Sequence, residues 1–117
     1  MKIGFIGLGN VGGKLAGSIL RNGYDLTVRD LNDTLVQDFV ARGAKSADSP
    51  KELAEACDIV ITCLPSPAAC SAVMEADDGI LSGISEGKIW AEMSTTDADE
   101  MARLAGLVTA AGAEAIE

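Results

Sequence analysis

The residues best placed to do chemistry are three glycines near the start of the chain. Gly7, Gly9 and Gly12 form the pattern GxGxxG between a short apolar run, residues 2–8, and an amphipathic segment. In such a loop the first glycine permits a tight turn, the second lets a pyrophosphate approach the backbone, and the third lets a helix pack closely on the strand. Free N–H groups at the start of that helix then face the anion. The pattern predicts a pyrophosphate-binding loop, and a glycine-rich turn without a ligand is the alternative.

An acid follows the glycine loop at the distance that this chemistry needs. Asp30 lies 18 residues after Gly12 (30 minus 12), at the end of a second apolar run, residues 26–29. It can accept hydrogen bonds from the adenosine ribose hydroxyls, and its charge would repel a 2′-phosphate. Arg29 could instead bind a phosphate, although strand alternation should point it away from Asp30. We expect NAD as the cofactor, with NADP less favoured; a helix-capping or solvated acid is the other interpretation of Asp30.

The segments that position these residues alternate between strand-like and helix-like patterns. Strands are expected at residues 2–8, 26–29, 58–64, 89–93 and 113–117, and helices at residues 10–22, 32–42, from Ser49-Pro50 onward, from Ser66-Pro67 to about 75, and 97–111. Such alternation with short connections predicts an α/β fold of the Rossmann type, a doubly wound parallel sheet in three layers.

Within these elements the sequence also indicates helix starts and buried faces. Serine followed by proline predicts a helix start at Ser49 and at Ser66. Asp97 with Glu100 is a further capping pair. In the first helix the apolar residues Val11, Leu15, Ile19 and Leu20 are expected to face the core, and in the second Leu35, Val36, Phe39 and Val40.

Composition excludes several other classes of function. The net charge of −9, from 18 acidic and 9 basic residues, disfavours nucleic-acid binding. Histidine is absent and the three cysteines have no CxxC spacing, so neither a metal site nor a disulfide framework is expected. Cys63 lies in an apolar run and is expected to be a buried, inert thiol. No apolar run is long enough to cross a bilayer and no signal peptide is apparent, so we expect a cytoplasmic protein without a membrane partner.

Three motifs occur in order along the chain: the opening GFIGLGNVGGKLAGSILRNGYDLTVRD, the strand end ITCLP at residues 61–65, and MSTT at residues 93–96. Together they resemble the β-hydroxyacid dehydrogenase family, whose members include 3-hydroxyisobutyrate dehydrogenase and tartronate semialdehyde reductase. The likeness covers essentially the whole chain. It implies an NAD(P)-binding domain of an oxidoreductase that transfers a hydride between the nicotinamide cofactor and a small 3-hydroxy acid or semialdehyde.

The same resemblance implies further cofactor contacts. Leu8, Asn10 and Val11 would line the pyrophosphate loop, Leu64 and Pro65 would pass near the two riboses, Ala69 would lie beside them, and Thr95 would approach the nicotinamide. Helix capping is the alternative for Ser94 and Thr95. Three residues depart from the family pattern and leave the branch of the family open. Ala98 replaces a usual proline, Val11 a common methionine and Lys14 a frequent proline.

The chain ends at Glu117, where family members continue into Asp-Ala-Pro-Val-Ser-Gly-Gly and a helical domain with a catalytic lysine. We therefore expect residues 1–117 to be a dinucleotide-binding domain truncated at the start of its sixth strand, with no catalytic residue of its own and no turnover alone. The exposed last strand and sheet face would favour a homo-oligomer.

Two other functions remain open at this stage. One is a non-catalytic module that senses a nucleotide or contacts another protein. The other is an NADP-dependent reductase domain of the 6-phosphogluconate or pyrroline-carboxylate type, whose glycine loops are related.

Overall fold

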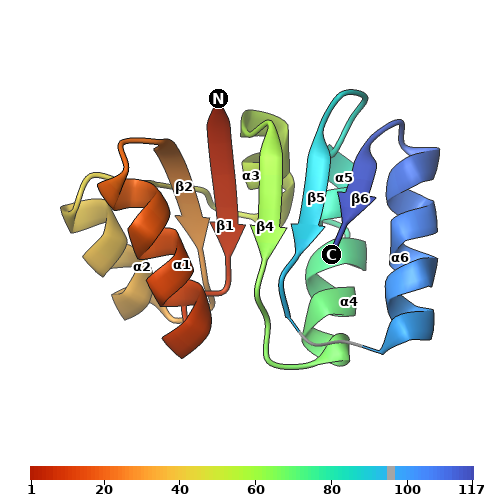
Figure 1. The fold of residues 1–117 in the computed structure, drawn as a ribbon, viewed down its shortest axis with the longest axis horizontal. Helices are drawn as coiled ribbons and strands as arrows, with labels where there is room; N and C mark the ends of the chain where they lie inside the picture. The colour runs from red at the N-terminus through yellow and green to blue at the C-terminus, as the bar shows by residue number, and fades with distance from the viewer. Residues whose placement is uncertain (95–96) are drawn as a thin grey trace.

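The computed structural model describes residues 1–94 and 97–117, and its centre is a parallel sheet (Figure 1). Its six strands are β1 (Lys2–Ile6), β2 (Asp25–Arg29), β3 (Lys45–Ser46), β4 (Ile59–Thr62), β5 (Ile89–Glu92) and β6 (Glu114–Ile116). They lie in the order β3-β2-β1-β4-β5-β6, and every neighbouring pair is parallel. The doubly wound fold expected from the sequence is confirmed.

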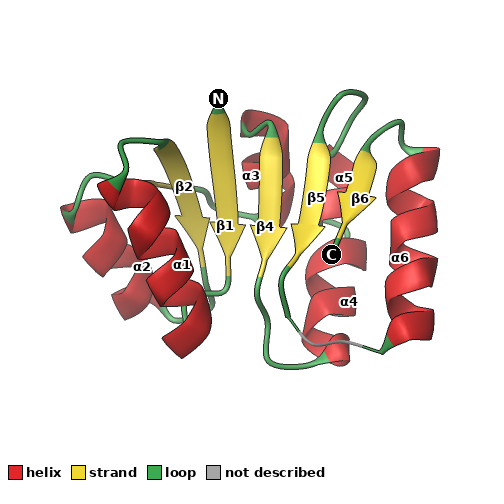
Figure 2. Cartoon of the chain, viewed as in Figure 1, coloured by secondary structure: helices red, strands yellow, loops and turns green. Residues whose placement is uncertain are grey.

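Helices cover both faces of the sheet and make the outer two layers (Figure 2). They are α1 (Asn10–Arg21), α2 (Asp33–Ala41), α3 (Pro50–Ala56), α4 (Pro67–Glu75), α5 (Ile80–Gly83) and α6 (Ala98–Ala110). On one face α1 and α2 bury an apolar cluster that includes Phe5, Val28 and Phe39. On the other face α3 to α6 bury a second cluster, with Leu53 and Trp90 at its centre. The two clusters sandwich the sheet, as the three-layer expectation required.

The helix starts expected from the sequence are present. The Ser49 hydroxyl accepts a hydrogen bond from the Glu52 N–H at 3.1 Å, and the Ser66 hydroxyl accepts one from the Ala69 N–H at 3.1 Å. Asp97 accepts from two backbone N–H groups in the first turn of α6. Because these bonds satisfy N–H groups that a helix leaves unpaired, the local sequence determines where each helix begins.

The buried face of α1 matches the expectation only in part, since Ile19 and Leu20 pack against the core cluster but Val11 and Leu15 do not belong to it. Val11 is 64% exposed and Leu15 is 37% exposed, whereas Ala16 is fully buried and Gly12 and Gly17 face the core. The helix packs so closely on the sheet that only small residues fit between them. The expected inward positions of α2 are correct, with Val36 and Phe39 buried.

Two short elements were not expected from the sequence. Strand β3 has two residues, and helix α5 has four. A period can be recognised only when it repeats. A strand has a period of two residues and a helix one of 3.6, so each of these elements holds only about one period. Both are therefore set by packing against their neighbours rather than by a pattern of their own.

An apolar groove remains on the face that carries α1 and α2. These helices pack on β1, β2 and β3. The groove lies beside α1 and is lined in part by residues of β4 and of the segment after β5. Its lining includes Leu15, Ile19, Tyr24, Ile61 and Met93. Among residues 1–94 and 97–117, no helix has the length and apolar character needed to span a membrane.

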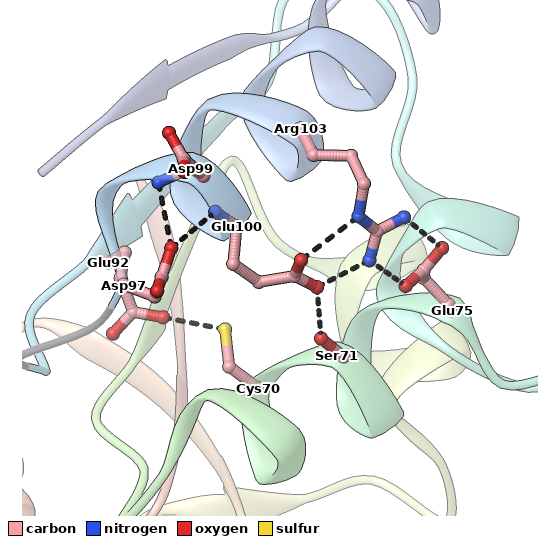
Figure 3. A network of polar contacts seen from close by, with 8 residues as sticks. All are labelled: Cys70, Ser71, Glu75, Glu92, Asp97, Asp99, Glu100 and Arg103. Atoms are coloured by element: carbon pink, nitrogen blue, oxygen red, sulfur yellow. Dashed lines mark hydrogen bonds and ion pairs between the residues drawn. The ribbon is translucent and has the colours of Figure 1, made fainter.

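An ion-pair network joins α4 to α6 (Figure 3). The Arg103 guanidinium contacts Glu75 on α4 and Glu100 on its own helix, each at 2.5 Å. The Ser71 hydroxyl donates to Glu100 at 2.5 Å. Glu100 thus takes part in both features: its backbone N–H donates to the Asp97 cap at 3.1 Å, and its carboxylate is engaged in this network. The hydrogen bonds from Arg103 and Ser71 hold the pKa of Glu100 at about 2, and the bond from Arg103 also lowers the pKa of Glu75.

These lowered pKa values predict an acid-dependent loss of stability. A carboxylate whose folded pKa is depressed stabilises the fold above its ordinary pKa of 4.5, and this stabilisation is lost as the pH falls from there toward about 2. We expect Arg103→Met to remove much of the change in unfolding free energy over this pH range. The change itself should be modest, because the groups are partly exposed. Urea unfolding between pH 2 and 6 measures it, with Arg42→Met, in the Arg42–Asp38 pair at 3.1 Å, as the matched control. Parallel stability curves for wild type and Arg103→Met would contradict the prediction.

Candidate cofactor site

The candidate site lies where the order of the strands reverses, between β1 and β4. The carboxyl ends of both strands reach the same edge of the sheet (Figure 1), and open α/β sheets bind ligands at such a point. Gly7 follows β1 and lies directly against the end of β4, because a Cβ on Gly7 would be 2.1 Å from the Cys63 carbonyl oxygen and 3.3 Å from Leu64. The structure thus brings the glycine loop and the Leu64 turn together.

The three glycines of the loop meet three different requirements. Gly7 has a φ of +103°, a conformation that other residues rarely adopt. Gly12 has no room for a side chain, since its Cβ would lie 1.9 Å from the Gly7 carbonyl oxygen. Gly9 has an ordinary φ of −68° and open space around it, with nothing within 4 Å of an added Cβ. Gly7 and Gly12 are therefore needed by the fold itself, whereas the fold alone leaves the side of Gly9 free.

Helix α1 begins at this loop without a side-chain cap. Gly9 is its N-cap residue and offers no side-chain acceptor. The N–H groups of a first helical turn have no partner within the helix, and here they belong to Asn10, Val11 and Gly12. Asn10 and Val11 are exposed beside the loop, while the Leu8 side chain is buried in the core. The helix start therefore offers backbone donors to an anion.

Asp30 is attached to the glycine loop. Its Oδ2 accepts a hydrogen bond from the Leu8 N–H at 2.7 Å and its Oδ1 accepts one from the Asn32 N–H at 2.8 Å. The residue is half-buried. Arg29 is occupied elsewhere, because its Nη1 donates to the Ala47 carbonyl at 3.2 Å. A carboxylate has about four lone-pair sites, so Asp30 retains acceptors for a ligand while fixing the loop.

The second part of the site is the turn after β4. The Leu64 N–H donates to the Ser94 hydroxyl at 2.6 Å, which joins this turn to the one that follows β5. Pro65 is exposed, and Ala69 is half-buried in the first turn of α4, where Ser66 accepts its N–H. Thr95, expected to approach the nicotinamide, lies outside the described residues.

The sequence analysis did not identify Glu92, which lies at the end of β5. Its side chain is only 2% exposed. It accepts hydrogen bonds from Thr62, Cys70 and Ser94, the first two at 2.8 Å. The available signal was an acid that closes an otherwise apolar strand, IWAE, directly before the Ser94 turn.

The cysteines offer no ready nucleophile. Burial raises the pKa of the thiol of Cys57, Cys63 and Cys70, and for Cys70 the hydrogen bond to Glu92 raises it further. Cys63, expected to be buried, is half-buried. Within the part of the chain that the structure describes, no cluster of histidine, cysteine and acidic residues could hold a metal ion. The open space at Gly9, the free donors of α1 and the Asp30 carboxylate together fit a dinucleotide.

Comparison with known proteins agrees with this geometry. The family described as the NAD binding domain of 6-phosphogluconate dehydrogenase matches residues 2–117. The uncharacterized oxidoreductase YfjR of Bacillus subtilis is 41% identical over 105 residues, which cover 90% of this chain and 37% of YfjR. The human cytokine-like nuclear factor N-PAC is 34% identical over 116 residues, 99% of this chain and 21% of N-PAC. The chain thus spans well under half the length of these relatives.

Solved structures show the same architecture. Psf3 in complex with NADP+ and 2-OPP superposes with a TM-score of 0.93 at 26% identity, covering 98% of this chain and 41% of that one. A reductive aminase from Aspergillus terreus, in complex with NADPH and ethyl levulinate, gives 0.85 at 28% identity, covering 97% and 39%. Since the family match includes all but the first residue, the chain belongs to the 6-phosphogluconate dehydrogenase type of NAD-binding domain, the nicotinamide-dinucleotide-binding domain of oxidoreductases.

Proposed function

We propose that this domain binds NAD across the carboxyl edge of β1, β2 and β4, and that its protein is a dehydrogenase or reductase of a small 3-hydroxy acid or semialdehyde. The observation that carries the proposal is the uncapped start of α1 at Gly9, with Asp30 bonded to the same loop. A helix N-terminus with free N–H groups attracts a phosphate. The substrate class rests on the resemblance to β-hydroxyacid dehydrogenases.

The dinucleotide would lie along the residues already described. Its pyrophosphate would meet the N–H groups of Asn10 and Val11 above Gly9, and Asp30 would accept from the hydroxyls of the adenosine ribose. Leu64 and Pro65 would pass near both riboses, with Ala69 beside them and Thr95 near the nicotinamide. The bound cofactor supplies the hydride. The domain's own task is to hold and orient it in a fixed position.

The proton donor of such a reaction would come from outside this domain. A general acid must lie within hydrogen-bond reach of the substrate oxygen. Lys88 donates to the carbonyls at the end of α3, Lys45 pairs with Asp25 at 3.3 Å, and Lys14 is exposed on α1. We therefore infer that the domain binds cofactor without turning over substrate.

Replacing Gly9 separates cofactor binding from folding. We expect Gly9→Ala to leave the melting temperature almost unchanged, because its Cβ meets nothing within 4 Å. The same methyl group would occupy the space of the pyrophosphate, and we expect NADH affinity to fall about tenfold or more. Titration of NADH fluorescence measures the affinity.

The matched control for that substitution is Gly12→Ala. Its Cβ would lie 1.9 Å from the Gly7 carbonyl oxygen. We therefore expect Gly12→Ala to lower the free energy of unfolding by about 1–3 kcal/mol. NADH affinity that is unaffected by Gly9→Ala would contradict the proposal, as would the absence of NADH binding by the wild type at millimolar cofactor.

The charge of Asp30 predicts preference for NADH over NADPH. A 2′-phosphate beside this half-buried carboxylate is repelled by more than about 1 kcal/mol, so NADH should bind at least about fivefold more tightly. Asp30→Asn should narrow the ratio of the two dissociation constants, whereas Asp33→Asn, an exposed acid at the start of α2, should not. Since the solved neighbours include complexes with NADP+ and NADPH, both cofactors must be measured. Tighter binding of NADPH would favour the NADP-dependent 6-phosphogluconate or pyrroline-carboxylate type of reductase.

A second candidate function is a nucleotide-binding interaction module without catalysis. The observation that favours it is the 34% identity to N-PAC over almost the whole domain, because that relative is named as a nuclear factor and not as an oxidoreductase. One measurement distinguishes the two candidates, namely the reduction of semialdehydes with NADH by the whole product of the gene. The first candidate predicts this activity and the second predicts none.

We also propose that the domain self-associates through its uncovered apolar face. Tyr24, Met93 and Ile116 are each more than half exposed on or beside this face, and strand β6 is an edge strand. Light scattering at high concentration should give a mass of at least twice 12.0 kDa. Leu15→Glu, in the groove, should return the protein to a monomer. A sharp monomer peak for the wild type would contradict this proposal.

A further inference from the structure

The buried carboxylate of Glu92 is the most densely bonded side chain at the edge of the sheet where the cofactor is placed. It lies opposite Thr62 in the register of β4 and β5. Taking a carboxylate out of water is costly unless donors surround it. Here Oε2 accepts from Thr62 and from Cys70, and Oε1 accepts from the backbone N–H and the hydroxyl of Ser94. Figure 3 shows Cys70 on α4 pointing at this carboxylate.

The direction of these hydrogen bonds is fixed by two groups that can only donate. The indole N–H of Trp90 donates to the Thr62 hydroxyl at 3.0 Å, so that hydroxyl gives its own proton to Glu92. The Leu64 N–H donates to the Ser94 hydroxyl at 2.6 Å, so that hydroxyl also gives its proton to Glu92. Both carboxylate oxygens must therefore accept, which an amide in the same place cannot do.

The two oxygens of Glu92 serve different parts of the molecule. The Oε2 limb runs through Thr62 to Trp90, both in the core. The Oε1 limb runs through Ser94 to the backbone of Leu64. It joins the turn after β5 to the turn after β4, and the Leu64 turn in turn lies against Gly7. Through Ser94, the buried Glu92 carboxylate therefore joins the turn after β4 to Ser94 after β5, at the place where the nicotinamide half of the dinucleotide is proposed to lie.

We propose that Glu92 is a positioning residue for the nicotinamide half of the cofactor, acting through Ser94 on the Leu64 turn. The inference rests on the proposed placement of the dinucleotide along Leu64 and Pro65. A buried carboxylate is a poor choice for packing alone, because a hydrophobic residue of similar volume often stabilises as well or better. Glu92 lies at the carboxyl end of a strand, and a ligand bound at that edge is oriented better when the turns around it are rigid.

The test compares a full dinucleotide with its adenine half. Calorimetry gives the dissociation constants of NADH and of ADP, since ADP would contact the glycine loop and Asp30 but lacks the nicotinamide and its ribose. We expect Glu92→Gln to weaken NADH about five- to tenfold and to change ADP by less than twofold. Ser94→Ala, at a half-buried position, should have the same selective effect, and it decides the question if Glu92→Gln does not fold.

Thr62→Val is the matched control within the same network. It removes only the Thr62 hydrogen bond to Oε2 and leaves those from Cys70 and Ser94 in place. It should therefore shift the fluorescence of Trp90, the single tryptophan, and lower the melting temperature while leaving the ratio of the NADH and ADP dissociation constants unchanged. A purely structural role would make Glu92→Gln and Ser94→Ala weaken both ligands equally, or neither, and either result overturns the proposal. If wild type binds neither ligand, the proposed function fails first and this inference fails with it.

Discussion

The close approach of β1, α1 and β4 around the glycine loop is the constraint on which the rest of the domain depends. A side chain at Gly7 would strike the end of β4, and one at Gly12 would strike the Gly7 carbonyl. Because α1 can come this near to the sheet, its start lies at the point where the strand order reverses. The small residue Ala16 is buried in the same core cluster one turn further along the helix, so the size of a few residues sets both the packing and the geometry of the loop.

This arrangement lets an acidic chain present a site for an anion. The net charge is −9, so the overall field opposes a dinucleotide, and attraction has to come from local dipoles. The unpaired N–H groups of the first turn of α1 supply it. Asp30 lies next to them, yet its two oxygens already face the N–H groups of Leu8 and Asn32, which reduces its repulsion of a nearby phosphate. The same carboxylate thus shapes the loop and remains available to a ribose.

Features with a local cause were predictable, and features set by packing were not. Ser49 and Ser66 act within one helical turn, so their sequence alone indicates the helix starts. The inward face of α1 depends on its distance from the sheet, which no periodicity of apolar residues records. Strand β3 and helix α5 are too short to carry a pattern. The pairing of Asp97 with Glu100 was predictable because it is local, whereas the bonds of the Glu100 carboxylate to Ser71 and Arg103 depend on how α4 packs against α6.

The two parts of the candidate site differ in how readily the sequence reveals them, again because one depends on local features and the other on packing. The part proposed for the pyrophosphate is built from backbone, and backbone exposure requires glycine, so its requirements appear as a spaced motif. The part proposed for the nicotinamide depends on side chains that meet from β4, β5 and α4, far apart in the sequence. A single acid such as Glu92 gives no spacing to recognise, and its role follows only once the sheet brings Thr62 and Ser94 to it. The less recognisable part is therefore the one whose two turns are joined through a single buried side chain.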